Sequence, residues 1–217
     1  MRRMISILFI FVAVLALTGA LTGGSVSAQT ACDFVTGGGF IIPDLATGAH
    51  GNFGVGGGCK HGSPTWGHLE YVDHGSGLAP TTAPTPFNVH GTGVTGYFFL
   101  GPTTREISGT ARTNDSNNSP VNYCVHVTDN GPGSTDIFQI QLTDTTTNGL
   151  LYDTGPHTLE GGNIELHKHN PSNTGSFSIG SCLVPTSCGG LFSSCVENSD
   201  CCSTLGLGCV NGSCVPS

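Results

Sequence analysis

Basic residues are scarce in this chain. Only six of its 217 residues are Lys or Arg, against fourteen Asp and Glu. Two of the six, Arg2 and Arg3, lie at the N-terminus, so the rest of the chain keeps four basic residues and a charge of about −10. Nucleic acids and anionic membranes select basic patches. This deficit therefore argues against both as partners.

A second long apolar segment is also missing. The one such run, residues 5–21, follows the two arginines and precedes small residues at 25–28 that suit a cleavage site. The pattern predicts a signal peptide over residues 1–28, since the run is short for a membrane span of about 20 residues. An uncleaved anchor and a lipid anchor at Cys32 are the alternatives. We expect a secreted protein, extracellular or on the cell surface, whose mature chain has no membrane span.

Helical periodicity is absent from the mature chain. Short segments alternate apolar and polar residues instead, and Gly, Pro, Asn and Asp separate them. The pattern predicts an all-β fold, an antiparallel β-sandwich of Ig-like or jelly-roll-like type over residues 29–181. The predicted strands lie near residues 34–42, 66–73, 87–92, 94–100, 104–112, 121–127, 138–142, 149–153 and 161–168.

Ten cysteines in an exported chain favour disulfide bonds. Four of them, Cys32, Cys59, Cys124 and Cys182, lie in or next to the predicted sandwich and allow three pairings. We prefer Cys32–Cys182 with Cys59–Cys124, because the first bond would close the module near its ends. A loop of about 150 residues closed in this way is worth ~5 kcal/mol in the chain-entropy description. The other six are Cys188, Cys195, Cys201, Cys202, Cys209 and Cys214.

The spacing of these six cysteines, with an adjacent pair at the centre, resembles that of knottins. The resemblance implies a disulfide-rich module over residues 182–217, paired Cys188–Cys202, Cys195–Cys209 and Cys201–Cys214. Spacing alone leaves fifteen connectivities open. The module contains no Lys or Arg, which argues against a trypsin-type inhibitor and a basic channel toxin. Leu205 and Leu207 offer an apolar tip that would suit binding.

The first module resembles a family of secreted bacterial all-β domains of unassigned function, the post-COAP-1 domain. The resemblance lies in TGGGFI at 36–41, GNFGV at 51–55, GHLEYVDH at 67–74, VTDNGPG at 127–133 with DIFQI at 136–140, and LEGGNIELH at 159–167. It implies the fold and the secreted setting, and brings no catalytic residues. This chain departs from the family by its extra cysteines and by a Pro/Thr/Ala stretch at 79–86.

Three groups of residues are candidate metal ligands. His68, Glu70, Asp73 and His74 form the densest polar cluster and suit a first-row metal, although no HExxH motif is present. A polar strand face with an Asp-capped turn is the alternative. Asp129, Asn130 and Asp136 flank a Gly-Pro-Gly turn and suit Ca²⁺, or else an Asx-turn. The third group is His167 and His169, which share one face of a terminal strand and suit Cu²⁺ or Zn²⁺, or else a solvated edge.

Trp66, the only tryptophan, either packs between sheets or stacks on a sugar ring, and the core position is favoured. Catalysis has little support, because the chain lacks a G-x-S-x-G elbow, a phosphate loop and a dinucleotide motif. We therefore expect a non-catalytic binding or structural protein with a glycan or protein partner, and no cofactor beyond a calcium ion. The alternatives are a knottin tail acting as inhibitor, toxin or antimicrobial, and a metal-dependent hydrolase.

Overall fold

The computed structural model describes residues 31–60, 65–132, 135–183, 207–210 and 213–216. The signal peptide predicted for residues 1–28 lies outside this part of the chain. So do four of the knottin cysteines and Leu205. Within the described residues there is no helix, and hence none that is long and apolar enough to cross a membrane.

Ten antiparallel strands form one sheet. Their order is β10-β1-β2-β3-β4-β5-β6-β7-β8, and β9 pairs with β7. The predicted all-β class is confirmed. The strands are β1 (Phe34–Asp44), β2 (Ala49–Gly58), β3 (Trp66–Asp73), β4 (Phe87–Phe99), β5 (Thr104–Thr113), β6 (Val121–Thr128), β7 (Ile137–Asp144), β8 (Leu150–Asp153), β9 (His157–Thr158) and β10 (Gly161–His167).

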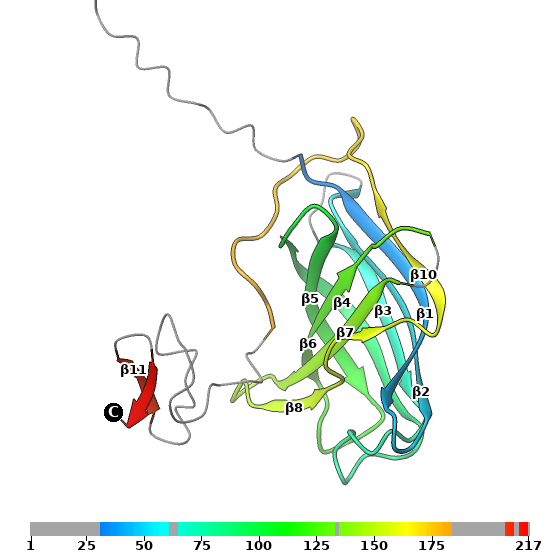
Figure 1. Cartoon of the computed structure of the whole chain (residues 1–217), viewed down its shortest axis with the longest axis vertical. Coiled ribbons are helices and arrows are strands. Elements are labelled where there is room, and N and C mark those ends of the chain that lie inside the picture. The colour runs from blue at the N-terminus through cyan, green and yellow to red at the C-terminus, as the bar shows by residue number, and fades with distance from the viewer. Residues whose placement is uncertain (1–30, 61–64, 133–134, 184–206, 211–212, 217) are drawn as a thin grey trace, which may run out of the picture. The chain divides into compact units, whose positions relative to one another are not determined.

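The sheet folds over itself instead of dividing into two sheets. Phe53 of β2 stacks on Phe138 of β7 with ring centroids 3.9 Å apart, and Tyr71 of β3 meets Tyr152 of β8 at 5.8 Å. Figure 1 shows β7 and β8 crossing over β3 and β4. The sequence predicted a two-sheet sandwich. The described strands run continuously from neighbour to neighbour, and the twist of a long sheet brings its two halves face to face.

The core lies between these two halves. The alternation predicted for β6 is present, since Val121, Tyr123, Val125 and Val127 are all buried. Some inner-face positions must be glycine. A Cβ on Gly109 would lie 2.4 Å from the ring of Tyr123, so the missing side chain makes room for the tyrosine.

Both disulfides of the first module differ from the predicted pairs. Cys32 bonds to Cys59, and Cys124 bonds to Cys182. The prediction of Cys32–Cys182 and Cys59–Cys124 was wrong because it ignored strand register. Cys32 precedes β1 and Cys59 follows β2, and the antiparallel pairing of Phe34 with Gly58 brings the two cysteines together. Cys182, the first residue of the predicted C-terminal module, is bonded to β6 and not to Cys32.

A second, two-stranded sheet belongs to the C-terminal part. It consists of β11 (Leu207–Val210) and β12 (Ser213–Pro216), in which Cys209 and Cys214 are register partners. The other knottin cysteines lie outside the described residues. The predicted knot pairs therefore stay a prediction.

A buried ion pair joins the start of the module to β5. Arg105 donates to both carboxylate oxygens of Asp33, from Nε at 3.1 Å and from Nη2 at 2.5 Å. Tyr97 donates to the same carboxylate at 2.9 Å, and burial, together with the negative charge of Asp33, raises the pKa of its phenol. The guanidinium also lies 4.6 Å from the ring of Phe99. Every charged atom of this group thus has a partner.

Arg105→Ala should destabilise the fold strongly, because it leaves the Asp33 carboxylate buried without its counter-charge. Loss of one partner of such a pair costs about 3–5 kcal/mol. Chemical denaturation of the disulfide-bonded protein measures this loss. Arg112→Ala, at an exposed site on the same strand, is the matched control and should change stability by less than about 0.5 kcal/mol. Equal effects of both variants would contradict a structural role for the pair.

Candidate functional site

The predicted cluster of His68, Glu70, Asp73 and His74 does not converge. His68 and Glu70 lie exposed on the outer face of β3, as alternation predicted. Asp73, one residue out of phase with that pair, points inward and is only 1% exposed. His74 follows the strand and is exposed. A single cleft containing all four, as the hydrolase alternative requires, is not formed.

Asp73 has a structural position instead. It accepts hydrogen bonds from the backbone N–H groups of Gly75 and Ser76 at 2.9 and 2.7 Å, which is the turn alternative. The hydroxyl of Tyr152 donates to it at 3.0 Å and lies 2.7 Å from the hydroxyl of Tyr71. Burial raises the pKa of both phenols. This neutral tyrosine pair explains how a carboxylate fits into the core.

His167 and His169 have separate partners. The ring of His167 stacks on Phe34 with centroids 4.4 Å apart, and its Nε2 lies 2.8 Å from Thr36 Oγ1. His169 Nδ1 lies 3.0 Å from the carbonyl oxygen of Cys32. The predicted chelating pair is therefore not brought together in this arrangement.

Asp129 and Asp136 bind backbone N–H groups. All four of their carboxylate oxygens accept such bonds, at distances of 2.7–2.9 Å. Two donors lie in the turn, as the Asx alternative expects, and two lie on the free edge of β10. The donors are Gly131 N and Leu166 N to Asp129, and Asn130 N and Ile164 N to Asp136. The Asn130 side chain donates to Thr135 O at 2.7 Å. The two carboxylates thus stabilise the turn and attach it to the edge of β10, and the geometry supports this role more directly than a Ca²⁺ site.

Asp136→Ala should lower the free energy of unfolding by about 2–4 kcal/mol, because a buried and a partly buried N–H group lose a charged acceptor. The loss should be the same with calcium and with a chelator. Thermal unfolding in both conditions measures it, and Glu160→Ala, at an exposed acidic site just before β10, is the control. A stabilisation by calcium that disappears in the Asp129→Ala and Asp136→Ala variants would restore the calcium interpretation.

Trp66 lies on the surface and not between sheets. It is half-buried at the start of β3. Its ring meets Phe34 edge-on at 5.8 Å, and the ammonium of Lys60 lies 4.7 Å from the ring centroid. With His167 these residues form an aromatic cluster at one end of the outer face of β10, β1, β2 and β3. The prediction that Trp66 packs in the core was wrong. Side chains alternate along a strand, so Trp66 shares the outward face of His68 and Glu70.

Glycines form the middle of this outer face. Gly38 of β1 pairs with Gly54 of β2, between Asn163 of β10 and Glu70 of β3. Packing does not require glycine here: a Cβ on Gly54 would meet nothing within 4 Å, and one on Gly38 would make an ordinary contact at 3.5 Å. A strand glycine without a packing reason often marks close approach of a ligand or another chain. The alternating glycines of β2 are a signal that we missed in the sequence.

A shallow depression of about 540 Å³ lies over Gly54. Phe40, Asn52, Glu70 and Val72 line it together with Gly54 and the backbone of β10. Phe40 stacks on His50 at 4.5 Å and so forms a second aromatic group. Phe40 lies six positions after Phe34 in β1, so a span of about 20 Å separates this group from the cluster at Phe34. The face thus presents aromatic rings at both ends and a low, partly polar middle.

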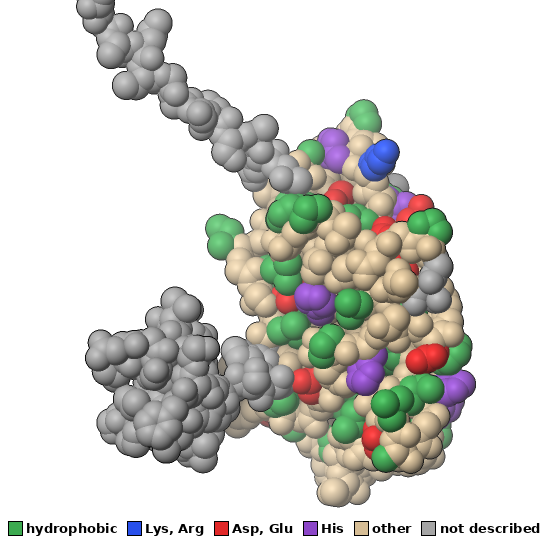
Figure 2. Space-filling view, in the orientation of Figure 1, with side chains coloured by type: hydrophobic (Ala, Val, Ile, Leu, Met, Phe, Trp, Pro, Cys, Tyr) green, Lys and Arg blue, Asp and Glu red, His purple; other side chains and the backbone are tan. Residues whose placement is uncertain are grey.

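The charge of the surface is low. Figure 2 shows one face of the molecule, on which Lys and Arg are rare and uncharged atoms predominate. Such a surface suits a neutral partner that forms hydrogen bonds and stacking contacts. It offers little to a polyanion.

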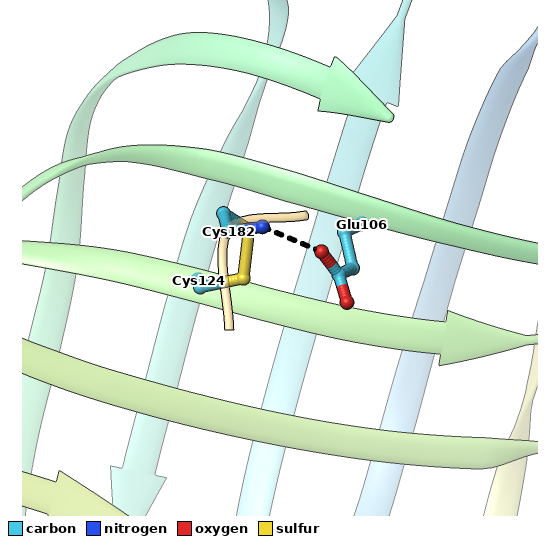
Figure 3. Close-up of side chains that lie close together, drawn as sticks. All are labelled: Glu106, Cys124 and Cys182. Carbon is cyan, nitrogen blue, oxygen red and sulfur yellow. Dashed lines mark hydrogen bonds between the residues drawn. A yellow bond between two sulfur atoms is a disulfide. The ribbon is translucent and has the colours of Figure 1, made fainter. Parts of the chain in front are cut away.

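A different group of potential ligand atoms lies on β5 and β6. Glu106, Cys124 and Cys182 are the only three residues in the described part of the chain whose ligand atoms lie within 4.8 Å of one another. Figure 3 shows why they do not suit a metal: the two sulfurs are bonded to each other, and the carboxylate accepts from Cys182 N at 2.7 Å. Ser181 Oγ donates to it at 2.7 Å, and His126 Nδ1 lies at 3.3 Å. The group fastens residues 181–182 to the sheet.

Burial alone would raise the pKa of the Glu106 carboxyl. The bonds from His126, Ser181 and Cys182 outweigh burial and lower this pKa below its usual value of 4.5. In the unfolded chain the carboxyl keeps its usual, higher pKa. The difference stabilises the folded state at pH values above the unfolded pKa, and this stabilisation is lost as the pH falls through the pKa of the folded state. Glu106 should therefore contribute to stability at neutral pH and contribute progressively less below about pH 4.5.

Glu106→Gln should flatten the fall in stability between neutral and acidic pH, because the group no longer ionises. Urea unfolding at a series of pH values measures this. Glu160→Gln, an exposed site just before β10 with no ion pair in the described part of the chain, is the control and should keep the wild-type fall in stability. A Glu106→Gln profile parallel to wild type would show that the carboxylate does not couple folding to pH.

Comparison of the chain with protein-family models, with curated proteins and with solved structures found no match. The resemblances to post-COAP-1 domains and to knottins therefore stay predictions from the sequence. The outer face of β10, β1, β2 and β3 is the candidate site on its own geometry.

Proposed function

We propose that this chain is an exported, non-catalytic binding protein that recognises an extended glycan. Its binding surface is the outer face of β10, β1, β2 and β3. The observation that carries the proposal is the depression over Gly54, which, like its register partner Gly38, is a strand glycine that packing does not require. A central strand glycine costs about 0.5–1 kcal/mol relative to alanine. Close approach of a ligand gives a reason for that cost.

The chemistry of this face favours a glycan over a protein. Sugar rings present apolar faces that stack on aromatic side chains, and hydroxyls that bond to amides and carboxylates. Trp66 and Phe34 lie at one end, Phe40 and its register partner Asn52 lie at the other, and Glu70 lies between them. A span of about 20 Å between the aromatic groups suits a chain of several sugars. The large apolar anchors typical of protein hot spots are not present in the middle of the face.

Separation of Asp73 from His68 and Glu70 supports a non-catalytic role. His68 and Glu70 face outward, whereas Asp73 is bonded in the core, so these groups do not form an acid–base pair. A hydrolase remains the weaker alternative. It would need to operate with Glu70 and the neighbouring His90, without Asp73.

The proposed binding protein is exported and carries a separate C-terminal module. Two disulfides in the first module are compatible with an oxidising, extracellular setting. We assign residues 188–217 to a knottin-like cap. An inhibitor, toxin or antimicrobial tail is the second candidate, and the lack of Lys and Arg in that segment counts against it.

Gly54→Thr tests the proposal, because it fills the depression where a new side chain meets nothing. Threonine suits strands, so this variant should be as stable as wild type or slightly more stable. It should bind insoluble polysaccharides at least tenfold more weakly in co-sedimentation. Gly101→Thr, at another open glycine away from this face, is the matched control and should bind normally.

Undiminished binding by Gly54→Thr would show that recognition lies elsewhere, with the C-terminal module as the next candidate. No binding by wild type to any of a panel of neutral polysaccharides would remove the glycan proposal. Thermal unfolding of each variant shows that any loss of binding is not a loss of fold.

A further inference from the structure

Glu70 and His90 form a carboxylate–imidazole pair on the outer face. They lie directly opposite each other on β3 and β4, and the Glu70 carboxylate contacts His90 Nδ1. Their side chains are 54% and 67% exposed, so His90 Nε2 is open to solvent. Two groups that commonly bind metals are thus already in contact.

His68 lies on the same face of β3, two residues before Glu70. Its cross-strand partner on β2 is Gly56, which has no side chain to restrain it. In the described part of the chain the exposed imidazole has no hydrogen bond or ion pair. Diagonal neighbours across a strand pair lie about 7–8 Å apart, within reach of long side chains. His68 is therefore a diagonal neighbour of His90 across β3 and β4, and both lie next to Glu70 at a separation that one ion can bridge.

We infer that His68, Glu70 and His90 form a binding site for a divalent first-row cation, Zn²⁺ or Cu²⁺. Two imidazoles and one carboxylate are a known zinc set that leaves a coordination position open. The exposed ring of His68 must rotate toward Glu70, since its nitrogens are not yet within 4.8 Å of the other two ligands. Bond lengths of about 2.0–2.2 Å then follow from the ligand types.

This ligand set differs from the one that the sequence predicted. His90 replaces Asp73 and His74, because strand register places His90 opposite Glu70, while Asp73 is bonded in the core. The site goes beyond glycan recognition. Glu70 also lines the depression, so the open coordination position of a bound ion would face a hydroxyl of a bound sugar. This last step alone rests on the proposed glycan binding.

Zinc titration of the mature, disulfide-bonded protein against a chromophoric chelator tests the site. We expect one equivalent to bind, and His68→Ala or His90→Ala to weaken binding at least tenfold. His74→Ala distinguishes the two ligand sets and should bind like wild type. His50→Ala is a second control, as an exposed histidine of the same face outside the set. All four positions are exposed, so these variants should keep the fold.

The single tryptophan gives an independent measurement. Atoms of Trp66 and of His68 both lie within 4 Å of the point where a Cβ of Gly56 would lie, so the two rings are neighbours. Cu²⁺ at the site should quench Trp66 fluorescence at one equivalent, and His90→Ala should abolish that quenching at the same concentration. Loss of zinc binding in His74→Ala equal to that in His90→Ala would overturn the assignment. So would small, equal losses in every histidine variant, which would mean independent binding to single imidazoles.

The metal and glycan proposals fail separately. Absence of zinc binding and of quenching in wild type removes the metal site and leaves polysaccharide co-sedimentation unaffected. Loss of co-sedimentation in Gly54→Thr with normal zinc binding supports the binding face and leaves the metal site in place.

Discussion

Two carboxylates from the loop between β6 and β7 hold the β10 edge of the sheet in place. Asp129 follows β6 and Asp136 precedes β7, and they accept the N–H groups of Leu166 and Ile164 on the edge of β10 that faces away from β1. Without these bonds β10 would present unpaired donors as a free edge. Because β10 pairs with β1, and β1 with β2, the loop also fixes the strands that carry the outer glycine face. The candidate site therefore depends on two aspartates that lie outside it.

Much of the fold could be predicted from the sequence, because alternation is a local property. The strands predicted at 121–127 and 138–142 lie within β6 and β7, with the expected residues buried. The disulfides could not be predicted in the same way. Cys32 and Cys59 meet only because β1 and β2 pair with Phe34 opposite Gly58, and that register comes from contacts along both whole strands. Loop-closure entropy favoured the longer loop but carries no information on register.

The candidate site was only partly predictable. Alternation correctly placed His68 and Glu70 on one outward face. It gave no partner for them, since His90 is reached through a loop whose length does not determine register. The inward turn of Asp73 depends on Tyr152, which lies 79 residues away in the sequence. Trp66 was expected in the core on grounds of size, whereas its phase relative to His68 already placed it outside.

The contrast between inner and outer glycines gives the strongest reason to look for function on this face. Inner-face glycines such as Gly57 and Gly109 are forced, because a Cβ there would overlap Ile107 or Tyr123. Gly38 and Gly54 are not forced, and each weakens its strand by about 0.5–1 kcal/mol. A fold closed by two disulfides and a buried ion pair tolerates that loss, but tolerance is not a reason to have glycine at two paired positions. A flat backbone surface between aromatic rings is a reason, because it lets an extended ligand lie close to the sheet.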